Sequence, residues 1–116
     1  MNIEEFRIYC LSKPLVTEEF PFDETTLVFK VCGKMFALTG LENIEFKVNL
    51  KCDPERALVL REEYDSIEEG FHMNKKHWNT VEVDGSFSID LFREMIDHSY
   101  DLVVKGLPKK LRDLLD

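Results

Sequence analysis

Apolar and polar side chains alternate most regularly between residues 44 and 51. Ile44, Phe46, Val48 and Leu50 are apolar, and a polar residue separates each from the next. Because successive side chains of a strand point to opposite faces, this period of two predicts a strand with one buried face and one solvated face. A shift of one residue would expose all four apolar side chains, so the pairing of this strand should have a fixed register.

Apolar positions spaced by three and four residues predict helices at both ends of the chain. The first helix covers about residues 3–12, with Asn2 as its N-cap and Glu5 placed to complete a capping box. Pro14 prevents this helix from continuing. The last long helix covers about residues 89–105, where Ser88 can cap its start and Gly106 can adopt a positive φ at its end. Its predicted buried seam is Ile89, Phe92, Ile96, Tyr100 and Val103.

A further helix is predicted directly after the alternating strand. Asp53 is a typical N-cap residue, and Pro54 suits the first helical position, where no amide donor is needed. Ala57, Leu60 and Tyr64 then recur at helical spacing. We expect these three side chains to face the core.

The remaining elements complete an α+β pattern. Strands are predicted over residues 25–31, 35–39, 67–72 and 78–83, with turns at Gly33 and at Asp84–Gly85 and a short helical segment over residues 109–115. The order is α-β-β-β-α-β-β-α. Since short turns join neighbouring strands, we expect one domain over residues 1–116, with a mostly antiparallel sheet and the helices on one face.

Composition places the chain among globular proteins. It has 116 residues, of which 44 % are hydrophobic, and this content is too high for a disordered chain. The net charge of −8 repels nucleic acid, so any contact with DNA requires a local basic patch. The three cysteines are far apart and form no C-x-x-C motif, which indicates reduced thiols in the cytoplasm. The N-terminus has no secretory pattern, and no apolar run is long enough to span a membrane.

One short window departs from the acidic character of the chain. The segment Gly70–Val81, GFHMNKKHWNTV, contains no acidic residue and carries two lysines and the only tryptophan. Lysines attract phosphate, tryptophan can stack on a base, and asparagine can hydrogen-bond to base edges. The candidate contact residues are His72, Asn74, Lys75, Lys76, His77, Trp78 and Asn79.

The same window also has a purely structural interpretation. Trp78 can pack in the core, since tryptophan is highly buried on average, and Asn74 and Asn79 can satisfy backbone groups of a turn. Contact with a protein or a small molecule is a third alternative. Whether Trp78 is buried or exposed therefore decides whether it is a core residue or a contact residue.

The predicted affinity for DNA is low and depends strongly on salt. Lys47 and Lys51 can add to the two lysines of the window, which gives only a handful of phosphate contacts. Between Lys47 and Thr80, seven acidic side chains oppose six lysines and arginines.

No catalytic, metal or cofactor motif stands out. His72, His77 and His98 have no cysteine near them in sequence, so we expect no metal site. Cys10 and Cys52 lack the sequence signatures of nucleophiles, although a cysteine and a histidine far apart in sequence can meet in the fold. There is also no glycine-rich phosphate loop. We therefore expect neither a cofactor nor an enzymatic activity.

Four blocks of the chain resemble the MmcQ/YjbR family of bacterial proteins. They are FPFDETTLVFKVCGKMFAL, VNLKCDPERALVLREEY, GFHMNKKHWNTV and the Ser99–Tyr100 pair, in the same order over about residues 20–107. The resemblance implies an α+β fold that is grouped with secretion chaperones and likened to frataxin. Members are often described as double-wing DNA-binding proteins, so the resemblance implies DNA binding.

Two functions therefore follow as expectations for a monomeric binding module. The first is weak, salt-sensitive binding of DNA through the window. The second is a protein-interaction or chaperone-like role in which the open face or edge of the sheet, near Lys47 and Asn49, receives a partner segment.

Overall fold

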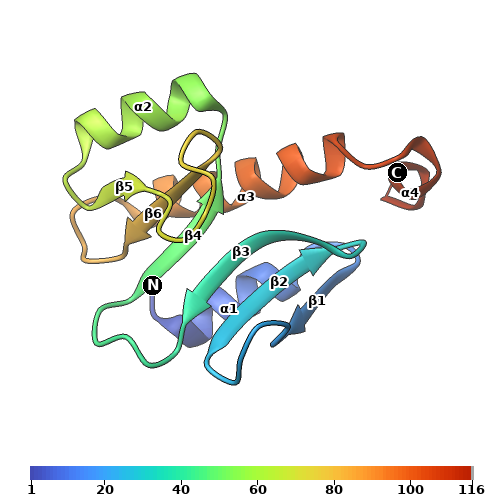
Figure 1. Cartoon of the computed structure of the whole chain (residues 1–116), viewed down its shortest axis with the longest axis horizontal. Coiled ribbons are helices and arrows are strands. Elements are labelled where there is room, and N and C mark those ends of the chain that lie inside the picture. The colour runs from blue at the N-terminus through green and yellow to red at the C-terminus, as the bar shows by residue number, and fades with distance from the viewer. Residues whose placement is uncertain (116) are drawn as a thin grey trace.

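Six strands form one antiparallel sheet in the order β1-β2-β3-β4-β6-β5 (Figure 1). The structure is a computed structural model that describes residues 1–115. The strands are β1 (Val16–Glu19), β2 (Thr26–Val31), β3 (Lys34–Gly40), β4 (Lys47–Lys51), β5 (Ile67–Glu69) and β6 (Trp78–Glu82). The helices are α1 (Ile3–Leu11), α2 (Pro54–Glu63), α3 (Ile89–Lys105) and α4 (Lys109–Arg112), followed by a 3₁₀ turn, η1 (Asp113–Leu115).

The helices cover one face of this sheet. In Figure 1, α1 and α3 lie behind the strands, and the opposite face is turned toward the viewer without a helix over it. Phe6 of α1 packs edge-on against Phe29 of β2 and stacks on Phe92 of α3. These contacts place the main core between the sheet and the helices and confirm the predicted two-layer α+β fold.

The register of β4 agrees with the predicted alternation over most of its length. Val48 and Leu50 are buried in the main core, and Asn49 between them lies on the other face, opposite Leu38 of β3. The prediction was wrong for Ile44, which is fully exposed because β4 begins only at Lys47. Residues 41–46 instead form the connection from β3 to β4, and outside a strand an alternating sequence does not place side chains on two faces.

Strand β1 was absent from the predicted order, and the observed order of helices and strands over residues 1–115 is α-β-β-β-β-α-β-β-α-α. It has four residues, VTEE, and pairs antiparallel with β2, from Val16 opposite Val31 to Glu19 opposite Val28. A short edge strand with two glutamates carries no hydrophobic alternation, so only its pairing with β2 defines it. Glu18 contacts Arg7 of α1 through a bidentate ion pair.

The predicted caps are confirmed. Asn2 and Glu5 form the capping box of α1, Asp53 accepts from the Arg56 amide at the start of α2, and Ser88 accepts from the Leu91 amide at the start of α3. Gly106 differs from the prediction, because its φ of −85° is right-handed. Its amide donates to carbonyls of α3 instead, so the helix ends without a left-handed residue. No helix within residues 1–115 is long and apolar enough to cross a membrane.

A single buried hydroxyl joins α3 to two strands. Ser99 Oγ accepts from the Lys51 amide at 2.9 Å and donates to the Phe36 carbonyl at 2.5 Å. Phe36 lies at the bulge of the β2–β3 pair, and Lys51 ends β4, so both backbone groups lack a complete strand ladder. Ser99 is fully buried, so its hydroxyl satisfies two backbone groups that water cannot reach.

We expect Ser99→Ala to lower the free energy of unfolding by about 1–3 kcal/mol, because two buried backbone groups would lose their partner. Chemical denaturation followed by the fluorescence of the single tryptophan measures this difference. Ser12→Ala, at an exposed hydroxyl after α1, is the control and should change stability by no more than about 0.5 kcal/mol. Equal effects of the two substitutions would contradict the bridging role of Ser99.

Candidate binding groove on the helix-free sheet face

The predicted contact window, residues 70–81, forms the loop 70–77 between β5 and β6 and continues into β6 from Trp78. The Gly70 amide donates to the Trp78 carbonyl at 2.8 Å, which closes the base of this loop. A Cβ atom at Gly70 would lie 2.7 Å from the Cβ of Trp78. The close approach of the two backbones therefore requires glycine at this position.

Trp78 is buried on the helix-free face. It lies opposite Lys51 in the β4–β6 pair and packs with Val28 and Leu38 in a second, smaller apolar cluster, with Met73 against it. Only 8 % of the residue is exposed. The indole is therefore a core side chain, and the structural interpretation of the window holds at this residue.

The two asparagines of the window also have structural partners. Asn79 points to the helix side, where it is 2 % exposed and its Oδ1 accepts from Arg61 Nε at 2.7 Å. Asn74 Oδ1 accepts from the amides of Lys76 and His77 and so shapes the turn. Neither Trp78 nor Asn79 can contact a ligand directly in this conformation.

The other four predicted residues are exposed. Lys75 Nζ donates to the Gly70 carbonyl at 2.5 Å, whereas Lys76 extends into solvent. The His77 carbonyl accepts from the amide of Cys52, directly after β4, at 2.8 Å, and its ring forms no hydrogen bond or ion pair with residues 1–115. His72 has a φ of 60°, and its ring lies 4.0 Å from that of Phe71.

Arg61 of α2 holds the second half of this loop in place. Besides Asn79, it donates to the carbonyls of Lys75 and Trp78. Sequence reasoning did not identify Arg61 as a functional residue, because the residues that it contacts lie 14 to 18 positions further along the chain.

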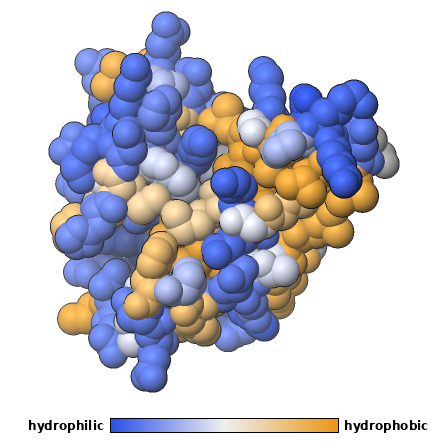
Figure 2. Space-filling view, turned by 45° about the vertical axis from the view of Figure 1, so that its right-hand side comes forward, coloured by the Kyte–Doolittle hydropathy of each residue, from blue (hydrophilic) through white to orange (hydrophobic). Residues whose placement is uncertain are grey.

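A groove of about 790 Å³ lies beside the loop on the helix-free face. Its floor is formed by strand residues that include Leu38, Asn49 and Thr80, and its walls are the connections 20–25, 41–46 and 70–77. We call it the sheet groove. Figure 2 shows that hydrophobic residues reach the surface of the molecule among hydrophilic ones. Two exposed hydrophobic residues line the sheet groove, namely Phe22 and Phe71, which are 64 % and 66 % exposed.

A three-residue network fixes the wall that carries Phe71. The Phe71 amide donates to Thr80 Oγ1 at 2.8 Å, Thr80 Oγ1 donates to Asn49 Oδ1 at 2.5 Å, and Asn49 Nδ2 donates to the Phe71 carbonyl at 3.2 Å. The amide and the carbonyl of Phe71 are thereby both hydrogen-bonded to side chains of the neighbouring strands. The polar face of β4 that the sequence predicts thus holds the aromatic rim in position.

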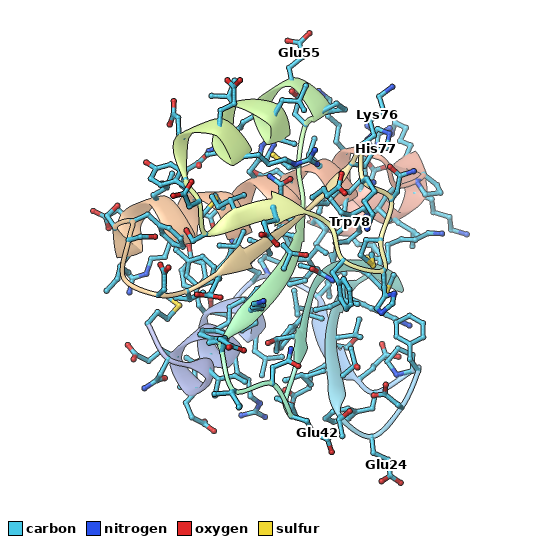
Figure 3. The ribbon with its side chains drawn as sticks, turned by 60° about the vertical axis from the view of Figure 1, so that its left-hand side comes forward. Glu24, Glu42, Glu55, Lys76, His77 and Trp78 are labelled. Atoms are coloured by element: carbon cyan, nitrogen blue, oxygen red, sulfur yellow. The ribbon has the colours of Figure 1, made fainter. Side chains whose placement is uncertain are left out.

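Charge is distributed unequally along the helix-free side. Figure 3 shows Lys76 and His77 toward the end of the molecule that also carries Glu55, and Glu24 and Glu42 at the opposite end. The connection 41–46 precedes β4, and Lys51 ends it, so the two ends are about 13 Å apart along the strand. The lysine end carries Lys34, Lys51, Lys75 and Lys76, none of which is in an ion pair with any residue in the range 1–115.

Two of the three thiols, those of Cys10 and Cys52, are poor nucleophiles in this environment. Burial raises the pKa of Cys52 to about 11 and raises the pKa of Cys10 as well, so both stay protonated near neutral pH. His98 lines a cavity of about 10 Å³ together with Cys52, but its Nε2 accepts from the Asp53 amide at 3.1 Å. Burial and then the charge of Arg56 lower the pKa of His98. The residues described, 1–115, contain no group of three histidine, cysteine or acidic side chains placed to hold a metal ion.

These features define an α+β domain with one sheet face left open as a groove. A family model described as YjbR matches residues 11–102, and the chain therefore belongs to the YjbR family. The family resemblance read from the four sequence blocks is confirmed.

Curated relatives and solved structures agree with this assignment. The protein named uncharacterized protein YbdF from Escherichia coli O157:H7 is 43 % identical over 101 residues, which are 86 % of this chain and 82 % of that protein. Uncharacterized protein YjbR from Escherichia coli K12 is 34 % identical over 115 residues, which are 99 % and 98 % of the two chains.

Among solved structures, Deinococcus radiodurans DR2400, described with a DUF419 domain, superposes with a TM-score of 0.91 at 42 % identity, over 98 % of this chain and 87 % of that one. A Pseudomonas syringae protein superposes with a TM-score of 0.75 at 27 % identity, over 88 % and 98 % of the two chains.

We expect Arg61→Ala to loosen the loop 70–77, because the Lys75 carbonyl, the Trp78 carbonyl and the buried Asn79 side chain would each lose a hydrogen bond. The emission of Trp78 should shift to longer wavelength, and the free energy of unfolding should fall by about 1–3 kcal/mol. Arg112→Ala on the exposed surface of α4 is the matched control and should change neither quantity. An unchanged emission spectrum in Arg61→Ala would contradict this role.

Proposed function

We propose that this chain is a non-catalytic binding module whose sheet groove receives an extended segment of a partner polypeptide. The observation that carries this proposal is the pair of exposed phenylalanines, Phe22 and Phe71, on the rim of a groove whose floor is a sheet face without a helix over it. Exposed aromatic side chains are costly in water and are enriched at protein interfaces.

The composition of the groove supports a polypeptide ligand. Leu38 and Met73 give the floor and one wall an apolar character, and Thr26, Asn49 and Thr80 place polar groups beside them. An apolar centre with a polar rim is the usual anatomy of a protein interface. The volume also suits a short segment, since it lies within the range of known ligand clefts.

Three further features belong to the same proposal. We take the module to be a monomer, in keeping with a floor and walls that segments of a single chain can supply. The protonated state of Cys10 and Cys52 supports a binding role over nucleophilic catalysis. All three thiols are free, which supports a cytoplasmic location.

We expect the double variant Phe22→Ala and Phe71→Ala to bind a peptide ligand about tenfold more weakly, because removing buried interface aromatics typically costs more than 1 kcal/mol. A panel of labelled peptides of about ten residues, the upper end of strand length, is screened by fluorescence anisotropy. The control variant, Ile8→Ala and Leu58→Ala, removes equally exposed side chains of α1 and α2. If no peptide binds, or if both variants lose the same affinity, the groove is not the binding site.

A second candidate function rests on the lysine end of the sheet. Lys34, Lys51, Lys75 and Lys76 gather there without acidic partners among residues 1–115, and this local charge favours contact with the phosphates of DNA. Because Trp78 is buried, such binding would depend on the backbone charge of DNA and not on base stacking.

For DNA, four lysine–phosphate contacts predict that the affinity falls with salt with a log–log slope of about −4. Replacing Lys51, Lys75 and Lys76 by alanine should reduce this slope to about −1, measured with a labelled duplex between about 50 and 200 mM salt. Lys109→Ala and Lys110→Ala on α4 leave the lysine end unchanged and serve as the control. Failure to bind at the lower salt, or an unchanged slope in the triple variant, would exclude this candidate.

A further inference from the structure

The walls of the sheet groove carry carboxylates that have no cationic partner. Glu42, Glu45 and Glu68 all line the groove and are exposed, and none forms an ion pair or a hydrogen bond within residues 1–115. Asp23, which also lines the groove, is engaged differently, since it accepts from the amides of Thr25 and Thr26 at 2.9 and 2.6 Å. Three free negative charges are therefore available to a ligand.

The positive groups of the groove do not neutralise these charges. Lys47 is the one lysine on its lining, and it lies 3.9 Å from Glu82 in an ion pair. The His72 ring packs against the Phe71 ring in a tilted arrangement, with the ring centroids 4.0 Å apart. The free lysines gather at the other end of β4 and do not line the groove. The interior of the groove is therefore negatively charged.

The aromatic rim adds a second preference for a cation with an apolar stem. Phe22 and Phe71 expose ring surface beside these carboxylates. A ring face attracts an ammonium or guanidinium group through its quadrupole, and the methylene stem of lysine or arginine covers apolar surface while its head reaches a carboxylate. Carboxylates and phenylalanines in one groove thus favour the same kind of side chain.

We propose that the sheet groove binds a basic, extended polypeptide segment in which lysine or arginine alternates with apolar residues. This inference rests on the proposed function and specifies its ligand. In an extended segment, successive side chains point in opposite directions. The apolar set can then contact Leu38 and Met73, and the cationic set can reach the carboxylates of the groove walls, Glu42, Glu45 and Glu68.

Charge argues for this ligand over the other classes. A net charge of −8 attracts a basic segment from a distance and repels an acidic one. The same repulsion acts on the phosphates of nucleic acid, which would have to approach three free carboxylates. A second copy of this chain carries the same net charge and is disfavoured for the same reason.

Three peptides of about ten residues test the charge preference, with valine alternating with lysine, serine or glutamate. None contains tryptophan, so the emission of Trp78, which packs on Leu38 and Met73 at the groove, reports on binding. The lysine peptide should bind at least about tenfold more tightly than the serine peptide, with an affinity that falls as salt rises. The glutamate peptide should not bind.

Charge-neutralising variants show whether this preference arises in the groove. Replacing Glu42, Glu45 and Glu68 by glutamine should abolish the preference for lysine. The matched control replaces Glu55, Glu62 and Glu63 on the exposed side of α2 by glutamine and changes the net charge equally; Figure 3 shows Glu55 far from Glu42. Circular dichroism confirms that both variants are folded. An equal loss in the two variants would overturn the inference, because the attraction would then come from net charge alone.

The outcomes separate this inference from the proposed function. If the serine peptide binds as tightly as the lysine peptide and the Phe22→Ala, Phe71→Ala variant weakens both, the groove binds polypeptides without preference for a base, and only the inference fails. If none of the three peptides nor any of the wider panel changes the emission of Trp78 or the anisotropy, both the inference and the proposed function fail.

Discussion

The alternation of side chains along the central strands governs the rest of this structure. In β2, β3, β4 and β6, one set of side chains forms the core with α1 and α3, and the other set must lie on the opposite face. No helix covers that second face (Figure 1). A loop covers part of it through Met73, and the rest remains as the sheet groove. The sheet groove is thus a consequence of helices that pack on only one face of the sheet.

Two polar residues connect the layers where strand pairing is incomplete. Ser99 joins α3 to the bulge near Phe36 and to the end of β4, and Arg61 joins α2 to the loop 70–77. Both satisfy backbone carbonyls or amides that no neighbouring strand reaches. The helical layer therefore positions the loop beside the groove, although that loop projects on the other side of the sheet. Three of the predicted contact residues in the window, Asn74, Trp78 and Asn79, therefore stabilise the fold.

Two groups of charged side chains lie at different places on the surface, although lysines and acidic residues are mixed in sequence. Lysines gather at the end of β4 and the start of β6, and free glutamates gather in the groove at the other end. One negatively charged molecule thereby offers two surfaces of opposite preference, a cationic end suited to phosphate and an anionic aromatic groove suited to basic side chains. The second surface combines charge with apolar contact, and so it has the stronger physical basis for specific binding.

The sequence alone determined the helices with their N-caps, the alternation of Val48, Asn49 and Leu50 in β4 and the overall α+β class, because these depend on periodicity and on hydrogen bonds between residues a few positions apart. It also marked the window 70–81 as unusual. Only the tertiary structure decided that β1 pairs with β2, that Ile44 lies outside the strand and that Trp78 is buried between Leu38 and Met73. Phe22, Phe71 and Glu42 became one site in the same way. These outcomes depend on contacts between segments far apart in the chain, and periodicity carries no information about which distant segment will cover a given side chain.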